Sequence, residues 1–148
     1  MAQHVFHLKA HWPGGRNDTG SIATRNLKTI VSIPPEMDGP GIGTNPDEML
    51  LGAAATCYII TLAAMIERSK VDKIDLTMES EGFVDVTNGM ITYEKIIHRP
   101  IVTIKHEQQK NISTLLHKLA IKAEHSCMIS RALKGNVEVD TILTIKTQ

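Results

Sequence analysis

The chain has 148 residues, of which 42% are hydrophobic, so its length fits one globular domain with enough apolar surface for a core. Sixteen basic residues balance sixteen acidic ones and aromatics make up 3%, which argues against nucleic acid or an anionic membrane as a partner. Residues 1–9 have no signal-peptide apolar region, and the cysteine pair lacks C-x-x-C spacing. We therefore expect a single domain, residues 1–148, in the cytoplasm.

Three short strands are expected in the first third of the chain. Residues 6–12 alternate between apolar and polar side chains, and residues 21–24 and 27–33 are typical of a second and a third strand. Glycine and proline are concentrated in residues 38–44, which we expect to form a loop over a functional site.

A strong helix start follows this loop. Thr44 or Asn45 can cap the helix, and Pro46 suits its first position. The acidic side chains of Asp47 and Glu48 complement the positive end of the helix dipole.

The body of this helix, residues 49–66, is apolar on every side. Such a pattern is typical of a helix that is buried all round. Its length alone would allow a membrane span, but Gly52, Thr56 and the charged end after residue 66 argue against one. One domain of this size can scarcely enclose such a helix, so we expect a partner subunit to help.

A strand pair is predicted next. Residues 74–86 alternate in polarity, the Asn-Gly pair at 88–89 favours a tight hairpin turn, and residues 91–97 form the return strand. We expect a bend at Pro100 and extended chain again over residues 101–105.

Two helices and a strand complete the chain. Residues 112–119 carry leucine and isoleucine at helical spacing, and a shorter helix of about residues 127–133 is closed by Gly135. Residues 137–145 are expected to form the last strand. The order βββ-α-ββ-αα-β predicts an α+β domain with antiparallel sheets.

The two cysteines are weak evidence of chemistry when each is taken alone. Cys57 lies in an apolar helix, where a free cysteine is commonly a small buried hydrophobe. Cys127 follows Ser126, a candidate N-cap, so its sulfur is expected in the first turn of the short helix, where its pKa would be lowered.

Two motifs around the cysteines resemble the OsmC/Ohr family, the osmotically inducible protein C and organic hydroperoxide resistance proteins. GTNPDEMLLGAAATC, residues 43–57, resembles the family's first-cysteine motif, and AEHSCMISRAL, residues 123–133, resembles its second, usually A-x-x-x-C-P-x-S-x-x-L. AHWPGGR, residues 10–16, is similar to the family's N-terminal segment. The resemblance covers nearly the whole chain and implies an intertwined homodimer with sheets around a long central helix.

The resemblance also implies roles for the cysteines. Cys57 would attack the outer oxygen of an organic hydroperoxide as a thiolate and become a sulfenic acid. Cys127 would condense with it to a disulfide, for which the two Cα atoms must approach within about 4.4 to 6.8 Å. An external dithiol, in the family typically protein-bound dihydrolipoamide, would reopen the disulfide, so no resident cofactor is implied.

An arginine and a carboxylate complete the site that the resemblance implies. Arg16 holds the matching position and Arg25 is the alternative, because the length of the intervening loop is uncertain. The family has glutamate directly after the proline; here Asp47 stands there and Glu48 follows. A second departure is Met128, which stands where proline commonly follows the second cysteine.

Helix geometry bears on the carboxylate. Ten residues separate Asp47 from Cys57, which is about 15 Å along a helix axis. If Asp47 belongs to the site, it must come from a second subunit, or the helix must break.

Two other functions stay open from the sequence. The departures at Asp47 and Met128 favour a redox-sensing or ligand-binding member that turns over poorly, and a third hypothesis is an interaction protein with inert buried thiols. The seven histidines show no metal-ligand spacing, although His125 lies close enough to Cys127 to tune its pKa.

Overall fold

A computed structural model describes the backbone of residues 1–148 and the side chains of residues 1–107 and 111–148. The chain forms two compact units, Met1–Met49 and Leu50–Gln148, and each is described by itself. The first unit holds three strands and a 3₁₀ turn: β1 (Lys9–His11), β2 (Gly20–Ala23), β3 (Lys28–Val31) and Pro35–Met37. The long helix α1 (Pro46–Arg68) leads into the second unit, which contains β4 (Lys73–Thr87), β5 (Met90–Ile104), α2 (Gln109–Ser126), α3 (Met128–Leu133), β6 (Glu138–Thr141) and β7 (Thr144–Thr147).

The first unit is an antiparallel sheet in the order β1-β2-β3, as predicted. β1 is shorter than the predicted strand 6–12. After it, the Trp12 indole N–H donates to the carbonyl of Gly15 (2.8 Å). The glycine-rich loop is fixed against β3: Ser32 Oγ donates to the carbonyl of Ile42 and accepts from its N–H. Gly43 has φ +71°, and a Cβ there would overlap the carbonyl oxygen of Ile30.

The start of α1 confirms Asn45 as its cap. The side-chain oxygen of Asn45 accepts the N–H of Glu48 at 2.9 Å, and its amide nitrogen donates to the Glu48 carboxylate at 2.7 Å. These reciprocal bonds satisfy a main-chain donor that the helix itself leaves unpaired.

One face of α1 is buried within the chain and the other is not, so the expectation that a partner subunit completes the burial of this helix stays a prediction. Tyr58, Leu62 and Ile66 are fully buried, whereas Ile60 on the opposite face is 62% exposed. The helix is long and apolar enough to cross a membrane by length and composition, but that test is also passed by core helices. The packing of its buried face makes α1 a core helix.

β4 and β5 form the predicted hairpin. Asn88 and Gly89 both have positive φ (53° and 75°), as the short turn requires. The expected bend at Pro100 is wrong, because β5 runs on as a strand to Ile104. Proline has no N–H to donate to a neighbouring strand. It can stand here because no strand pairs with β5 beside it: β6 ends at Thr141 and β7 starts at Thr144.

The last strand is split, and its direction differs from the prediction. β6 and β7 both pair with β5 in parallel, so the second sheet is mixed rather than wholly antiparallel. α2 and α3 form a crossover connection between β5 and β6, and such a connection lets the chain return in the same direction.

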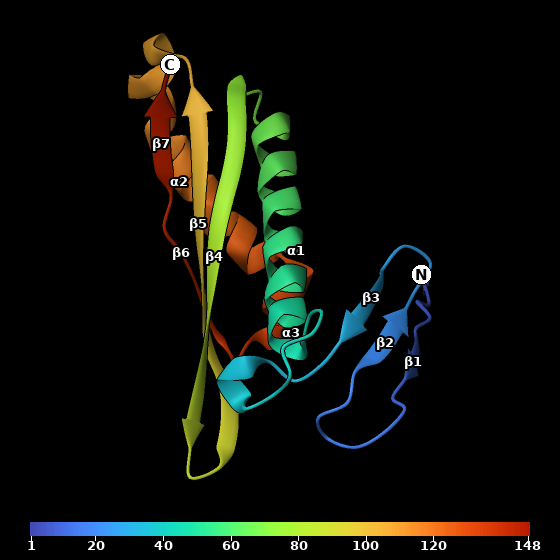
Figure 1. Cartoon of the computed structure of the whole chain (residues 1–148). Coiled ribbons are helices and arrows are strands. Elements are labelled where there is room, and N and C mark those ends of the chain that lie inside the picture. The colour runs from blue at the N-terminus through green and yellow to red at the C-terminus, as the bar shows by residue number, and fades with distance from the viewer. The chain divides into compact units, whose positions relative to one another are not determined.

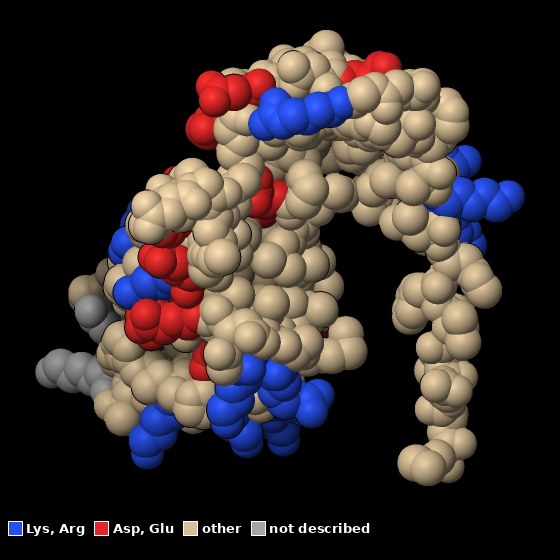
Figure 2. Space-filling model, turned by 90° about the horizontal axis from the view of Figure 1, so that it is seen from below, with Lys and Arg blue, Asp and Glu red and all other residues tan. Residues whose placement is uncertain are grey.

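One face of this sheet carries the helices of the second unit (Figure 1). Along β5 every second residue from Ile96 to Ile104 is buried, as a strand with one covered face requires. The main core is formed by residues of α1, β5 and α2 and the segment between α1 and β4: Tyr58, Leu62, Met65, Ile66, Val71, Val102, Ile104, Leu116, Leu119 and Ala123. Both signs of charge, and wide uncharged areas, occur on the surface shown in Figure 2.

Candidate active site

The two cysteines meet between α1 and the start of α3. Cys57 lies in the fourth turn of α1 and is partly buried, while Cys127 is completely buried between α2 and α3. Both are free thiols, and the Cys127 side chain is hydrogen-bonded to that of Cys57. The two side chains are neighbours although they stand 70 residues apart in the sequence. The roles of the two cysteines stay a prediction.

The surroundings of Cys57 favour its ionised form. Burial raises the pKa of the Cys57 thiol, but hydrogen bonds outweigh burial and bring the pKa below its ordinary value. The groups that lower it are, from the largest influence to the smallest, the Cys127 side chain, the main chain of Ile129 and of Met128, and the Thr61 side chain. A sulfur with several donors and partial exposure has the properties of a nucleophilic thiolate.

Cys127 differs from the expectation. Ser126 is the last residue of α2, and Cys127 itself caps α3, with φ −60° and ψ 126°. Burial and the hydrogen bond to Cys57 raise the pKa of the Cys127 thiol, so the predicted lowering is wrong. Cys127 is a buried thiol that keeps its proton and donates a hydrogen bond to the sulfur of Cys57.

Three of the groups that lower the pKa of Cys57 were not predicted from the sequence. Thr61 stands one helical turn after Cys57, a spacing that could have indicated it, and its hydroxyl donates to the carbonyl of Cys57 at 2.7 Å. The N–H groups of Met128 and Ile129 belong to the main chain, so no side-chain pattern points to them.

A buried polar cluster lies next to the cysteines. Tyr58 stacks on His98, with ring centroids 4.8 Å apart, and its hydroxyl donates to the carbonyl of Ala120 at 2.9 Å. His98 Nδ1 shares a hydrogen bond with Ser80 Oγ at 2.7 Å. Burial lowers the pKa of His98 to about 4 and raises that of Tyr58 to about 12, so both rings are neutral at physiological pH.

Arg16 belongs to the first unit, and both cysteines belong to the second. Its guanidinium donates to the carbonyl oxygens of Met37 (2.7 Å) and Asp38 (3.3 Å) and to the Asn17 side chain. Arg25, the alternative arginine, is exposed in the turn between β2 and β3. The assignment of either arginine to the cysteine site stays a prediction.

The Glu48 carboxylate takes part in the cap of α1. Glu48 accepts the hydrogen bond from Asn45 described above, and Asp47 is the second residue of α1. α1 is unbroken from Pro46 to Arg68, so of the two routes considered for the Asp47 carboxylate, the broken helix is excluded.

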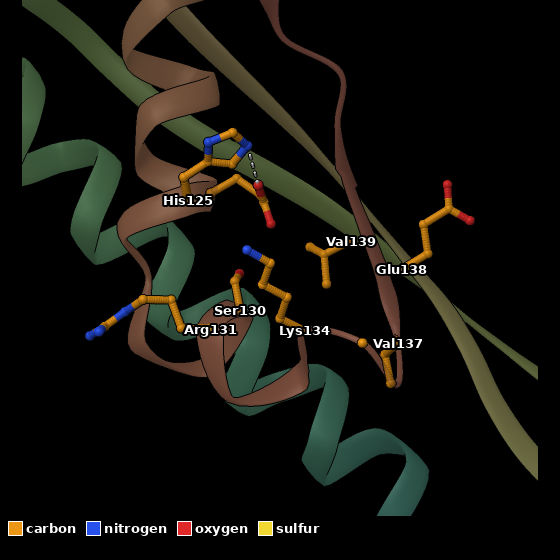
Figure 3. Close-up of a pocket in the computed structure, with 9 residues that line it drawn as sticks. His125, Ser130, Arg131, Lys134, Val137, Glu138 and Val139 are labelled. Atoms are coloured by element: carbon orange, nitrogen blue, oxygen red, sulfur yellow. Dashed lines mark ion pairs between the residues drawn. The ribbon is translucent and has the colours of Figure 1, made fainter.

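A pocket of about 450 Å³ is lined by residues of α2, α3 and β6 and the segments next to them (Figure 3). His125 pairs with Glu124 at its rim (Nε2 to Oε2, 3.2 Å), and burial raises the pKa of the Glu124 carboxyl. Lys134 extends toward His125, while Arg131 points away. His125 is not among the groups that shift the pKa of Cys127. Among the described side chains, no group of three or more His, Cys, Asp or Glu could hold a metal ion.

Comparisons with known proteins agree with this fold. An uncharacterized protein of Bacillus subtilis (strain 168), YmaD, is 65% identical over 146 residues, covering 99% of this chain and 97% of that protein. The organic hydroperoxide resistance protein of Xanthomonas axonopodis pv. citri (strain 306) is 26% identical, covering 94% of each chain. The crystal structure of an organic hydroperoxide resistance protein OsmC from Legionella pneumophila has a TM-score of 0.76 and 26% identity, covering 99% of this chain and 100% of that one. Residues 39–142 match the family described as OsmC-like protein, and the chain belongs to this family.

Proposed function

We propose that this chain is a cytoplasmic thiol peroxidase that reduces organic hydroperoxides to alcohols. The observation that carries the proposal is the contact between a partly exposed cysteine with a lowered pKa, Cys57, and a buried thiol, Cys127. The relatives named organic hydroperoxide resistance proteins support the substrate class.

The reaction has three balanced steps. The Cys57 thiolate attacks the outer oxygen of R–O–O–H, the O–O bond breaks, and after proton transfer the products are the alcohol R–OH and Cys57 sulfenic acid. The Cys127 thiol then attacks the sulfenic sulfur, forming the disulfide and releasing water. A dithiol reduces the disulfide to two thiols and is itself oxidised to a cyclic disulfide; dihydrolipoamide is the candidate.

Two measurements test this proposal. One equivalent of cumene hydroperoxide should lower the protein mass by two hydrogens, and peptide mapping should link Cys57 to Cys127. Steady-state turnover should occur with tert-butyl hydroperoxide and dihydrolipoamide. If neither cumene hydroperoxide nor tert-butyl hydroperoxide is turned over with dihydrolipoamide, the chain is not a peroxidase. Turnover that persists in Cys57→Ser would contradict the role of Cys57.

The alternative function is a redox sensor or ligand-binding member of the family. The aspartate at position 47 and the methionine at position 128 depart from the pattern of the peroxidases and favour this alternative. It predicts that the disulfide forms at a measurable rate but that steady-state turnover is negligible. A purely structural role predicts instead that neither thiol reacts with iodoacetamide in the folded protein.

A homodimer is part of the proposal. The exposed face of α1, which carries Ile60, gives a second copy a surface to cover. The unbroken helix also keeps Asp47 about 15 Å along the axis from Cys57 of its own chain, so a carboxylate at the site would come from the partner.

The arginine assignment can be tested by a matched pair of variants. If Arg16 stabilises the thiolate and positions the peroxide, Arg16→Met should slow the oxidation of Cys57 by about a hundredfold, while Arg25→Met should have little effect. The reverse result would transfer the role to Arg25. Asp47→Asn and Glu48→Gln, compared in the same assay, would show which carboxylate orients the arginine.

A further inference from the structure

The pocket between the end of α2, α3 and β6 is built on a fixed turn of the main chain. Gly135 has φ +88°, which closes α3 and lets the chain turn into β6. The N–H groups of Asn136 and Val137 both donate to the carbonyl of Leu133, at 2.9 and 3.0 Å. Val137 is also buried in an apolar cluster with Ala54 of α1, so packing holds this wall of the pocket in place.

A buried hydroxyl faces this pocket. Ser130 is 5% exposed and lines the pocket, and its oxygen points into it (Figure 3). Among the described side chains, Ser130 Oγ is one of three buried polar atoms that make no hydrogen bond. Ser130 also influences the pKa of Cys127, but a thiol sulfur is a weak acceptor and does not satisfy a hydroxyl. Burying a hydroxyl without a partner is unfavourable, so this group gains by bonding to a ligand.

Lys134 brings a positive charge to the same space. It directly follows α3, and its exposed side chain extends over the pocket toward His125 (Figure 3). The ion pairs among the described side chains do not include Lys134. Glu124, the partly buried acid of this pocket, is paired with His125 instead. An ammonium group and a hydroxyl that both face one pocket are suited to an oxyanion, because charge-assisted hydrogen bonds are the strong ones.

The other lining groups narrow the ligand to a singly charged anion with an apolar part. Glu124 and Glu138 place two carboxyl groups on the lining, so a doubly charged anion would be repelled. Val137 and Val139 offer apolar surface to a hydrocarbon chain. The volume of about 450 Å³ lies within the range of small-molecule sites, about 300–1,000 Å³. A short aliphatic carboxylate has all of these properties.

We propose that this pocket binds a small aliphatic monocarboxylate. Its carboxylate accepts a hydrogen bond from the Ser130 hydroxyl and pairs with the Lys134 ammonium, and its chain lies against the two valines. Neither Cys57 nor Cys127 is among the residues that line the pocket, so the proposal goes beyond the peroxidase function and does not depend on it. Arg131 also lines the pocket, but its side chain points away and takes no part.

An NMR titration with sodium hexanoate at constant ionic strength tests the site. The amide resonances of Ser130, Lys134 and Val139 should shift along one saturable curve with a millimolar dissociation constant. Hexanamide, which has the same chain and no charge, should bind at least about tenfold more weakly, and sulfate, a doubly charged anion, should not compete. The proposal would be overturned if these resonances did not move, or if hexanamide or sulfate bound as well as hexanoate.

Three variants assign the contacts. Ser130→Ala should weaken hexanoate binding about tenfold, because it removes a hydrogen bond to a charged acceptor. Lys134→Gln should weaken it about fivefold, since an exposed ion pair contributes less. Arg131→Gln removes the same charge three residues away but no group that faces the pocket, so it should bind hexanoate like wild type. Equal weakening in Arg131→Gln and Lys134→Gln would mean that net charge alone attracts the anion, and the proposed site would be wrong.

Thermal melting gives a test that does not depend on resonance assignments. Because Ser130→Ala removes a buried hydroxyl without a hydrogen bond, its melting temperature without hexanoate should not fall below that of wild type. Saturating hexanoate should raise the melting temperature of wild type and raise that of Ser130→Ala less. A clear fall in Ser130→Ala without hexanoate would mean that the hydroxyl is already satisfied within the protein, which would overturn its role as a ligand contact. Neither readout uses peroxide turnover, so the pocket and the peroxidase stand or fall separately.

Discussion

The two faces of α1 have nearly the same hydrophobicity and very different surroundings. One face, with Tyr58 and Leu62, is completely buried against the sheet and α2, whereas Ile60 on the other face is 62% exposed. Cys57 lies at the boundary between them, where α3 supplies hydrogen-bond donors and the sulfur keeps partial exposure. The comparison shows that the reactivity of a cysteine on an apolar helix depends on where it lies relative to neighbouring helices and strands. The hydropathy of the sequence does not contain this information.

The largest expected effect concerns the boundary residue itself. Cys57→Ser should abolish turnover, a loss of at least about a thousandfold, because a serine hydroxyl does not ionise in this range and reacts poorly with peroxides. Cys127→Ser should also lose dithiol-driven turnover, but one equivalent of hydroperoxide should still be consumed. Dimedone labelling of a Cys57 sulfenic acid would detect this difference. If both variants behaved alike, the assignment of Cys57 as the first cysteine to react and of Cys127 as the second would be wrong.

The second prediction compares the two faces directly. Leu62→Ala should lower the free energy of unfolding by about 2–5 kcal/mol, because it leaves a cavity in the core of one subunit. Ile60→Lys should leave the fold of each subunit intact, since surface substitutions change stability by about 0.5 kcal/mol or less, but it should dissociate the proposed homodimer.

Sedimentation and thermal melting over a range of protein concentrations separate these outcomes. For Leu62→Ala the loss should persist at every concentration, whereas for Ile60→Lys the melting temperature should no longer depend on concentration. An Ile60→Lys variant that sediments like wild type would show that the exposed face of α1 is not the dimer interface.

Some parts of the fold and of the site can be predicted from the sequence, and others cannot. Local chemistry determines the start of α1 at Asn45 and the turn at residues 88–89, so both were predictable. The cysteine pair was predicted by resemblance, because contact between residues 70 positions apart depends on the tertiary fold. The course of β5 through Pro100 was not predictable, since it requires a gap in a strand pairing formed by residues 40 positions later.

The third prediction uses the buried ring of His98. Its pKa is lowered to about 4 in the folded protein and is about 6.5 in an unfolded chain, so below pH 6.5 the unfolded state binds a proton that the folded state does not. This contribution to stability is complete above pH 6.5 and is lost as the pH falls toward 4, by up to about 3 kcal/mol.

Carboxyl groups titrate over the same pH range, so the pH dependence of stability in the wild type must be compared with that of His98→Gln. Denaturant unfolding between pH 7 and pH 4 should show a steeper loss of stability in wild type than in the variant, even if the variant is less stable at pH 7. Parallel profiles would mean that His98 is protonated in the folded protein or is not buried.

The smallest expected effect is that of Tyr58→Phe on the buried face of α1. Burial, the largest of the influences on this group, raises the pKa of Tyr58 to about 12, so its hydroxyl remains a donor to the Ala120 carbonyl across the accessible pH range. Removing the hydroxyl should cost about 1 kcal/mol in denaturant unfolding, while the ring still fills its place against His98. Because the bond joins α1 to α2 and does not reach the Cys57 sulfur, the rate of Cys57 oxidation should stay within about twofold of wild type. A much slower oxidation with unchanged stability would mean that the Tyr58 hydroxyl takes part in the oxidation of Cys57. In that case its main role would not be the hydrogen bond that stabilises the core.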